Sequence, residues 1–305
     1  MTITLTVRTA SWRAHVARVA STVEGLVPVV KGNGYGFGRV ALAEIAAEFC
    51  DTVAVGNVHE LDGLPGDLHA VVLTPTLAAP ASTDPVLTVG HRAHLERLDG
   101  WRGKVLVKLE SSMHRYGRGI ELIDVARARG LEVIGISVHL PLVGSSAEHA
   151  DEIRTTIADV HADLPVWLSH LDPPTYASLP ATHTYRLRLG TSLWHGDKSA
   201  LKLRADVLDV RPIRAGQHAG YRQGRVDDDG HLVMVGAGTA SGVTALPDGR
   251  SPFHFERRRL RLHEDPHMHT SMAFVPAGDP VPDIGGSVEV QRPLTMTTVD
   301  TVEWI

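Results

Sequence analysis

The residue in this chain that is best suited to take part in a chemical reaction is Lys31, which directly follows the apolar segment 27–30. Glycines alternate with other residues over 32–38, so the backbone there can adopt positive φ angles and approach a bulky ligand closely. A lysine at the end of a buried strand is partly desolvated, which tunes its amine to form a Schiff base with an aldehyde cofactor. Tyr35 lies four residues later, near enough to hydrogen-bond a group attached to that amine. Spacing alone is equally compatible with a surface lysine in a flexible loop.

The whole string, Val29-Val-Lys-Gly-Asn-Gly-Tyr-Gly-Phe-Gly38, decides between these interpretations. It resembles the lysine motif of the alanine racemase family, Val-Val-Lys-x-Asn-x-Tyr-Gly-x-Gly, which ends the first strand of a barrel. The resemblance implies that pyridoxal 5′-phosphate (PLP) is joined covalently to Lys31, with Tyr35 among the cofactor-binding residues. It also implies an enzyme, a racemase-like isomerase that acts on the α-carbon of an amino acid.

Two further strand ends match the same family. Residues 107–117, Val-Lys-Leu-Glu-Ser-Ser-Met-His-Arg-Tyr-Gly, are similar to its Lys-x-Asp-Thr-Gly-Met-x-Arg-x-Gly signature. By this resemblance Arg115 contacts the phenolic oxygen of the cofactor, and Lys108, often carbamylated in the family, supports the arginine. His139 follows the apolar segment 133–138 and resembles the family histidine that packs beside the pyridine ring. A purely structural histidine is the alternative at this position.

The end of the predicted barrel supplies the remaining cofactor contacts. Residues 186–194, Arg-Leu-Arg-Leu-Gly-Thr-Ser-Leu-Trp, resemble the family's Arg-x-Gly-Ile-x-Leu-Tyr-Gly, whose arginine faces the pyridine nitrogen. Arg188 inherits that role. It would keep the nitrogen unprotonated, because a proton there would place two positive charges together, and this favours simple proton transfer. The resemblance implies that the phosphate group of the cofactor is bound by Gly190, Thr191 and Thr175, with Ser178 as the alternative to Thr175.

The second base that the family uses for racemisation is replaced. In the family it is a tyrosine in a Gly-Tyr-x-Asp-Gly turn that reaches in from the partner subunit, and the matching turn, residues 235–242, has Thr239. An aliphatic hydroxyl is a far weaker acid than tyrosine, whose pKa is roughly 10, so it is a poor base at neutral pH. His269, in a segment similar to the family's Met-Asp-Gln-x-Met, and Tyr221 are candidate replacements. Trp304, near the end of a short tail, takes the position of a phosphate-binding tyrosine.

Short β-rich segments recur through the first two thirds of the chain and must position these residues. They are residues 27–30, 52–55, 70–74, 86–89, 105–109, 133–138, 166–168 and 184–187. Amphipathic segments with helical spacing, such as 39–50 and 147–164, lie between most of them. This alternation predicts a (β/α)8 TIM-type barrel over residues 8–200, with a doubly wound open sheet as the alternative.

The pattern changes after about residue 193. Helical periodicity disappears, and strand-like pieces are separated by turn clusters rich in glycine, proline and aspartate. We therefore expect a smaller all-β domain over residues 201–305, with residues 2–7 as an additional strand. By the resemblance, the protein is a homodimer in which each β domain closes the active site of the other subunit.

Composition narrows the classes of partner. The chain has 305 residues and a formal net charge of −5, so it lacks the basic surface expected of a protein that binds nucleic acid or an anionic membrane. Cys50 is the only cysteine, which leaves no internal disulfide. No apolar run approaches about 20 residues, and the first residues lack the pattern of a secretory signal. A small-molecule amino acid substrate and a cytoplasmic location are expected.

Two alternatives to a racemase stay open. The replacement at Thr239 and the short tail favour a PLP-binding protein with little racemase activity. The motif His263-Glu-Asp-Pro-His267-Met-His269 is compatible with a metal-assisted D-amino-acid lyase, similar to D-threonine aldolase or D-serine dehydratase, because alternate strand residues share a face. A solvent-facing histidine cluster is the more economical interpretation of that motif in a chain with 18 histidines, so no metal site is predicted.

Overall fold

The computed structural model describes residues 3–305 and divides into two compact units. One unit consists of Ala14–Gly34 and Arg39–Gly196. The other consists of the described part of Met1–Arg13 together with Tyr35–Gly38 and Asp197–Ile305. Thr2, which the sequence analysis includes in a strand, lies outside the described residues. The predicted boundaries at 8–200 and 201–305 stay a prediction.

The first of these units contains a nearly closed barrel of eight parallel strands, which confirms the predicted TIM-type architecture. Its strands are β2 (Leu26–Pro28), β3 (Thr52–Val55), β4 (His69–Val72), β5 (Val86–Val89), β6 (Lys104–Lys108), β7 (Glu132–Ser137), β8 (Val166–Ser169) and β9 (Tyr185–Leu189). They pair in the order β2-β9-β8-β7-β6-β5-β4-β3. Val29 and Ala54 form a parallel bridge beyond β2, and Val30 N donates to Ala54 O at 2.9 Å, so the two ends of the sheet meet.

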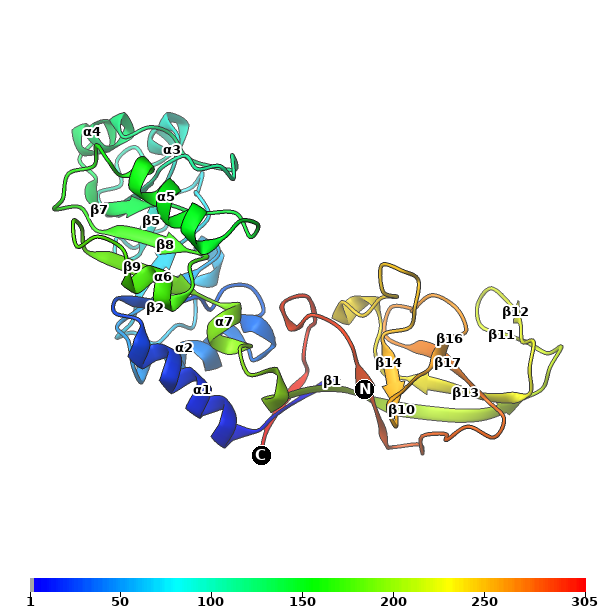
Figure 1. The fold of residues 1–305 in the computed structure, drawn as a ribbon. Helices are drawn as coiled ribbons and strands as arrows, with labels where there is room; N and C mark the ends of the chain where they lie inside the picture. The colour runs from blue at the N-terminus through cyan, green and yellow to red at the C-terminus, as the bar shows by residue number, and fades with distance from the viewer. Residues whose placement is uncertain (1–2) are drawn as a thin grey trace. The chain divides into compact units, whose positions relative to one another are not determined.

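The strands are buried because their sequences are apolar on both faces, as parallel strands covered by helices must be. Every residue of β3 and of β5 is buried. The helices are α1 (Thr9–Thr22), α2 (Arg39–Ala47), α3 (Arg92–Arg97), α4 (Glu121–Ala128), α5 (Ser146–Thr156), α6 (Pro173–Ala177) and α7 (Thr191–Trp194). Figure 1 shows α3 to α6 around the outside of the barrel strands.

Two segments depart from regular strand and helix alternation. The connection between β4 and β5 has no helix among the described residues, because Pro75, Pro80 and Pro85 interrupt it and proline removes a backbone donor. The amphipathic segment 147–164 is helical only to the end of α5 at Thr156. Beyond that point the chain turns, while its apolar side chains remain buried.

The second unit is an antiparallel sheet with one parallel pair at its edge, which confirms the predicted all-β region. Its strands are β1 (Ile3–Val7), β10 (Leu201–Ile213), β11 (His218–Ala219), β12 (Gly224–Arg225), β13 (Gly230–Val235), β14 (Phe253–Phe255), β15 (Arg258–Arg259), β16 (Arg261–Leu262), β17 (Ser271–Pro276), β18 (Ser287–Val290) and β19 (Thr301–Trp304). The main sheet has the order β15-β14-β18-β10-β13-β17-β16, and Figure 1 shows β10 as its long central strand. β1 pairs antiparallel with β10 and parallel with β19.

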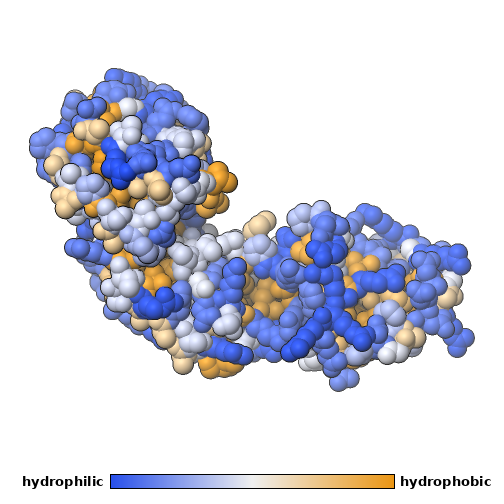
Figure 2. All heavy atoms as spheres, in the orientation of Figure 1, coloured by the Kyte–Doolittle hydropathy of each residue, from blue (hydrophilic) through white to orange (hydrophobic). Residues whose placement is uncertain are grey.

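Aromatic side chains join separate segments of this second unit. The Trp12 ring lies 5.0 Å from that of Phe37 and 5.2 Å from that of Trp304. Rings at such distances bury large apolar areas and hold the segments that carry them together. Figure 2 shows mainly hydrophilic residues on the face in view, with smaller apolar patches. Within residues 3–305, no helix has the length and apolar character needed to span a bilayer.

Candidate active site

Lys31 stands just beyond β2 and begins a tight turn. Gly34 N donates to Lys31 O at 3.2 Å, and Gly34 has φ of 61°, a left-handed conformation that favours glycine. A Cβ at Gly34 would lie 2.3 Å from the backbone nitrogen of Arg39, so a side chain would also collide with the start of α2. The alternating glycines of the motif therefore permit an abrupt passage from strand to helix.

Tyr35 also has a positive φ, of 55°, which is uncommon for a residue with a side chain. Its side chain is buried, and desolvation raises the pKa of the Tyr35 hydroxyl to about 12. The hydroxyl is therefore a neutral hydrogen-bonding group at physiological pH. It is suited to hold a ligand rather than to take up a proton.

The electrostatic surroundings of Lys31 favour its neutral form. The side chain reaches solvent, yet surrounding protein atoms desolvate the amine, and this is the largest cause of its lowered pKa. The positive charges of Arg115 and Arg188 lower the pKa of Lys31 further, while the carboxylate of Glu60 raises it. A larger fraction of neutral amine is the form that attacks an aldehyde.

Lys108 ends β6 with its side chain only 5 % exposed. Burial lowers the pKa of Lys108 to about 7, and the charges of Arg188 and Arg115 act in the same direction. The following turn carries Arg115, whose guanidinium lies over the Tyr116 ring at 5.2 Å from its centroid. The charges of Arg115 and Arg188 thus act on both Lys31 and Lys108.

Arg188 is the most firmly held member of this group. It projects from β9, is 6 % exposed, and donates from Nη1 to Ser137 Oγ at 2.9 Å and from Nη2 to Val138 O at 3.0 Å. Its Nε donates to Leu168 O at 3.2 Å, and Nη2 also donates to Trp167 O at 3.4 Å. These bonds use four of the five N–H groups of a guanidinium. Burial lowers the pKa of Arg188 to about 10, with a further contribution from the charge of Arg115, so the side chain remains cationic at neutral pH.

His139 lies just past β7 and forms a hydrogen bond through Nδ1 with Ser169 Oγ at 2.7 Å. Its ring centroid is 4.7 Å from that of His170. Burial lowers the pKa of His139 to about 2, and the charges of Arg188 and Lys108 add to the effect. The imidazole is therefore neutral, with its orientation fixed by Ser169.

The three residues that the sequence predicts to bind the phosphate group lie in the turns that follow β8 and β9. Gly190 precedes α7, which begins at Thr191. The first N–H groups of such a turn have no carbonyl partner within it. Thr175, in α6, is engaged otherwise, because its Oγ1 donates to Asp172 Oδ2 at 3.0 Å and its N donates to Asp172 Oδ1 at 2.8 Å. A phosphate role for Thr175 stays a prediction and would require that carboxylate to give way.

Thr239 and His269 belong to the β-sheet unit, and both are exposed. Thr239 begins a short turn and donates from its backbone N to His267 O at 2.8 Å. His267 in turn forms a hydrogen bond of 2.6 Å through Nε2 with Glu264 Oε1, and its ring centroid is 4.4 Å from that of Tyr221. Of the three histidines in the sequence motif, His267 is therefore the one with an acidic partner beside the Thr239 turn.

That motif does not assemble a metal site in the described part of the chain. Within residues 3–305, no group of three or more histidine, cysteine or acidic side chains is arranged to hold a metal ion. His263 bonds instead to Ala219 O at 3.0 Å.

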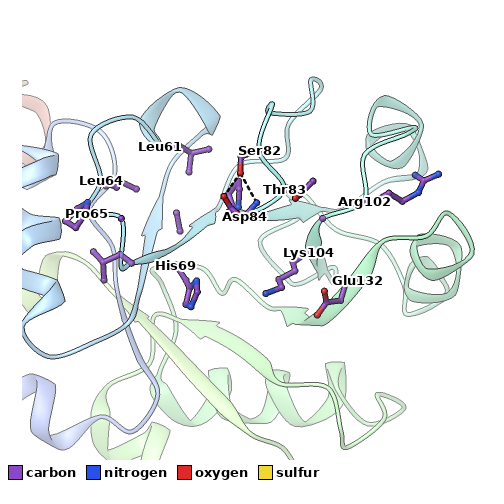
Figure 3. A pocket seen from close by; sticks show the side chains of 15 residues that line it. Leu61, Leu64, Pro65, His69, Ser82, Thr83, Asp84, Arg102, Lys104 and Glu132 are labelled. Atoms are coloured by element: carbon purple, nitrogen blue, oxygen red, sulfur yellow. Dashed lines mark hydrogen bonds between the residues drawn. The ribbon is translucent and has the colours of Figure 1, made fainter.

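A cavity of about 660 Å³ opens at the end of the barrel where the strands begin, opposite the end that carries Lys31 (Figure 3). Among its lining residues, His69, Lys104 and Glu132 are the first residues of β4, β6 and β7. Lys108, by contrast, is the last residue of β6, and chemistry in such barrels is carried at the carboxyl ends of the strands. This cavity is therefore separate from the predicted site.

Several residues that support the site were not predicted from the sequence. Ser137 and Ser169 are the last residues of β7 and β8 and form hydrogen bonds with Arg188 and His139, and the available signal was a serine within or at the end of an apolar strand. Glu60 acts on Lys31 from the turn after β3, and no motif pointed to it.

Comparisons with known proteins bear on the family and the fold of this chain. The family model described as "Alanine racemase, N-terminal domain" matches residues 7–197. The alanine racemase of Alteromonas mediterranea is 24 % identical over 327 residues, covering 95 % of this chain and 90 % of that protein. The solved alanine racemase of D-cycloserine producing Streptomyces lavendulae has a TM-score of 0.76 at 20 % identity, covering 100 % of this chain and 97 % of that one. The alanine racemase of Bartonella henselae, solved with covalently bound pyridoxal phosphate, has a TM-score of 0.73 at 17 % identity and covers 100 % of both chains.

Proposed function

Because this chain belongs to the alanine racemase family, we propose that Lys31 carries PLP and that the enzyme moves a proton at the α-carbon of an amino acid. The protein is a PLP-dependent enzyme of racemase type. The assignment of individual residues is our proposal, and the observation that carries it is the group of cations around Lys31.

The charges at the strand ends fit this cofactor. The charges of Arg115 and Arg188 lower the pKa values of Lys31 and Lys108, and the charge of Arg115 also lowers that of Arg188. Among the described residues, none of the four forms a salt bridge with an acid. Lys108 and Arg188 are buried, and burying like charges without a salt-bridged acid is unfavourable. A phosphorylated pyridine with a phenolic oxygen would add negative charge to that of Glu60, so the residues present suit PLP.

We infer the following binding roles. When PLP is bound, Arg115 would contact its phenolic oxygen, Lys108 would support Arg115, and the remaining N–H of Arg188 would serve the ring nitrogen. His139, being neutral, packs beside the ring without adding charge. Tyr35, Gly190, Thr191 and Thr175 complete the proposed set of cofactor contacts.

PLP, when bound, supplies an electron sink for the substrate's α-carbon. The chain's own base is the Lys31 amine, and its lowered pKa keeps more of it unprotonated near neutral pH, as a general base requires. Arg188 holds a fixed positive charge that discourages protonation of the ring nitrogen, so proton transfer is favoured over other reactions of the substrate.

The second face of the substrate is where this chain differs from a racemase with a tyrosine. Thr239 supplies only an aliphatic hydroxyl, while His269 stands on an exposed segment of the same unit. We propose that racemisation is slow and that exchange from one face is the faster process. A PLP-binding protein with little racemase activity is the second candidate, favoured by the same threonine.

Hydrogen exchange at the α-carbon tests the reaction. The holoenzyme is incubated in deuterated water with L-alanine or D-alanine, and deuterium uptake and inversion are followed by mass spectrometry and chiral chromatography. We expect uptake from one enantiomer to exceed inversion, and Lys31→Ala to abolish both. An absence of uptake from either enantiomer, across a panel of amino acids, would leave the binding protein as the better interpretation.

We also propose a homodimer with shared active sites, located in the cytoplasm. The family resemblance over the β region supports the dimer, and the single cysteine is compatible with a reducing compartment. Light scattering of the purified holoenzyme would report the mass of one chain if the dimer proposal is wrong.

A further inference from the structure

One carboxylate connects the lysine turn to the neighbouring strand end. Glu60 Oε2 accepts hydrogen bonds from Gly32 N at 3.1 Å and from Gly56 N at 2.7 Å. Its Oε1 accepts a bond from Asn57 Nδ2 at 3.2 Å. Since Gly32 follows Lys31 beyond β2 and Gly56 follows β3, Glu60 joins the carboxyl ends of two strands that meet where the barrel closes.

The backbone leaves space for this carboxylate. A Cβ at Gly56 would lie 2.9 Å from Glu60 Oε1 and 3.1 Å from Oε2, closer than a side chain normally tolerates. Glycine at this position therefore allows the carboxylate to lie directly against the main chain. Hydrogen bonds from backbone N–H groups to an ionised carboxylate are stronger than those between neutral groups.

Glu60 also balances the charge at Lys31. Arg115, from the turn after β6, and Arg188, from β9, are the cations that act on the lysine amine, and both lower its pKa. Glu60 is the acid that acts in the opposite direction. Its effect on Lys31 and its bond to the next residue along the chain thus come from the same carboxylate.

We propose that Glu60 is a positioning residue for Lys31: it fixes the lysine turn through the Gly32 N–H and supplies the negative charge that offsets Arg115 and Arg188 at the amine. The role rests on the proposed function of Lys31. Glu60 itself does not touch the reacting atoms. It sets where the amine lies and how readily it loses its proton.

The test measures the proton affinity of Lys31 in the cofactor-free protein. Amines are labelled competitively with acetic anhydride at a series of pH values from about pH 6 to about pH 11, and peptide mass spectrometry measures the label on Lys31. The labelling midpoint is the pH at which Lys31 reaches half of its maximal reactivity. Glu60→Gln removes the charge with little change of shape and is expected to lower the midpoint by roughly half to one pH unit. Glu60→Asp keeps the charge, so its midpoint should fall by less than half as much.

A matched control is Glu148→Gln. Glu148 also accepts a bond from a backbone N–H, that of Ser145 at 2.7 Å, but it caps α5 and is not among the charges that act on Lys31. The Lys31 midpoint should be unchanged in this variant. An equal change in Glu148→Gln would overturn the proposal, because the effect would then be a general one.

A second variant covers the case in which Glu60→Gln does not fold. Gly56→Ala keeps the charge but moves the Glu60 carboxylate away from the backbone at residue 56, so the labelling midpoint of Lys31 should again move to lower pH. A folded Glu60→Gln or Gly56→Ala protein with the wild-type midpoint would refute the role of Glu60. Labelling needs no PLP. A failure of cofactor binding would therefore contradict the proposed function, while the labelling midpoint of Lys31 would still test the role of Glu60.

Discussion

Replacing Lys108 with methionine is expected to stabilise the cofactor-free protein at neutral and acidic pH. Lys108 is 5 % exposed, and burial together with the charges of Arg188 and Arg115 lowers its pKa to about 7. In the unfolded chain the same lysine has its ordinary pKa of 10.5. Between these two values the unfolded state binds more protons than the folded state, so the free energy of unfolding rises with pH.

The size of the effect follows from the two pKa values. One pH unit between them corresponds to about 1.4 kcal/mol, so the buried charge costs at most about 5 kcal/mol below pH 7. Methionine keeps an unbranched side chain in the same space and carries no charge. We therefore expect Lys108→Met to gain about 2 to 4 kcal/mol at about pH 6, and the gain to vanish toward about pH 10.

Urea unfolding of the cofactor-free protein, followed by circular dichroism at a series of pH values, measures this gain. Lys104→Met is the matched control, since Lys104 begins the same strand and is exposed. Its difference from the wild-type protein should not depend on pH. A Lys108→Met variant that is no more stable than wild type at about pH 6, or whose gain is the same at every pH, would refute the reasoning.

Three further predictions concern particular side chains. Arg188→Lys cannot reproduce the four guanidinium hydrogen bonds and should lower the free energy of unfolding by about 2 to 4 kcal/mol in urea titration, whereas unchanged stability would contradict the observed bonding. Gly34→Ala should lower the Tm more than Gly32→Ala, because a Cβ at Gly34 meets the backbone 2.3 Å away and one at Gly32 meets nothing within 4 Å; equal Tm values would show that the turn adapts. Thr239→Tyr should speed inversion of alanine by about tenfold or more if a base is missing on one face, and an unchanged rate would place the limitation elsewhere.

The sequence predicted the architecture because its strongest signals are local. Apolar runs such as 105–109 and 133–138 correspond to β6 and β7, and the all-β region lies where helical periodicity ends. The lysine motif indicated the position of Lys31 beyond β2, where the structure has it. The predicted chemical roles of the site residues stay predictions.

What the sequence did not predict depends on contacts that only the folded backbone defines, both between distant segments and within single turns. Glu60 reaches Gly32 across 28 positions, and no local pattern encodes that bond. His267 rather than His269 has an acidic partner, a distinction that depends on how the segment turns back on Glu264. The hydroxyl of Thr175 bonds Asp172 because the two lie in one helical turn, which competes with the phosphate role taken from the resemblance.

The most direct test of the central proposal is to find where PLP becomes attached. The purified protein is incubated with PLP and reduced with borohydride, then digested and mapped by mass spectrometry. We predict a yellow protein before reduction and a single pyridoxyl label on Lys31, with both lost in Lys31→Ala. A protein that stays colourless, or a label that leaves Lys31 unmodified, would contradict the account.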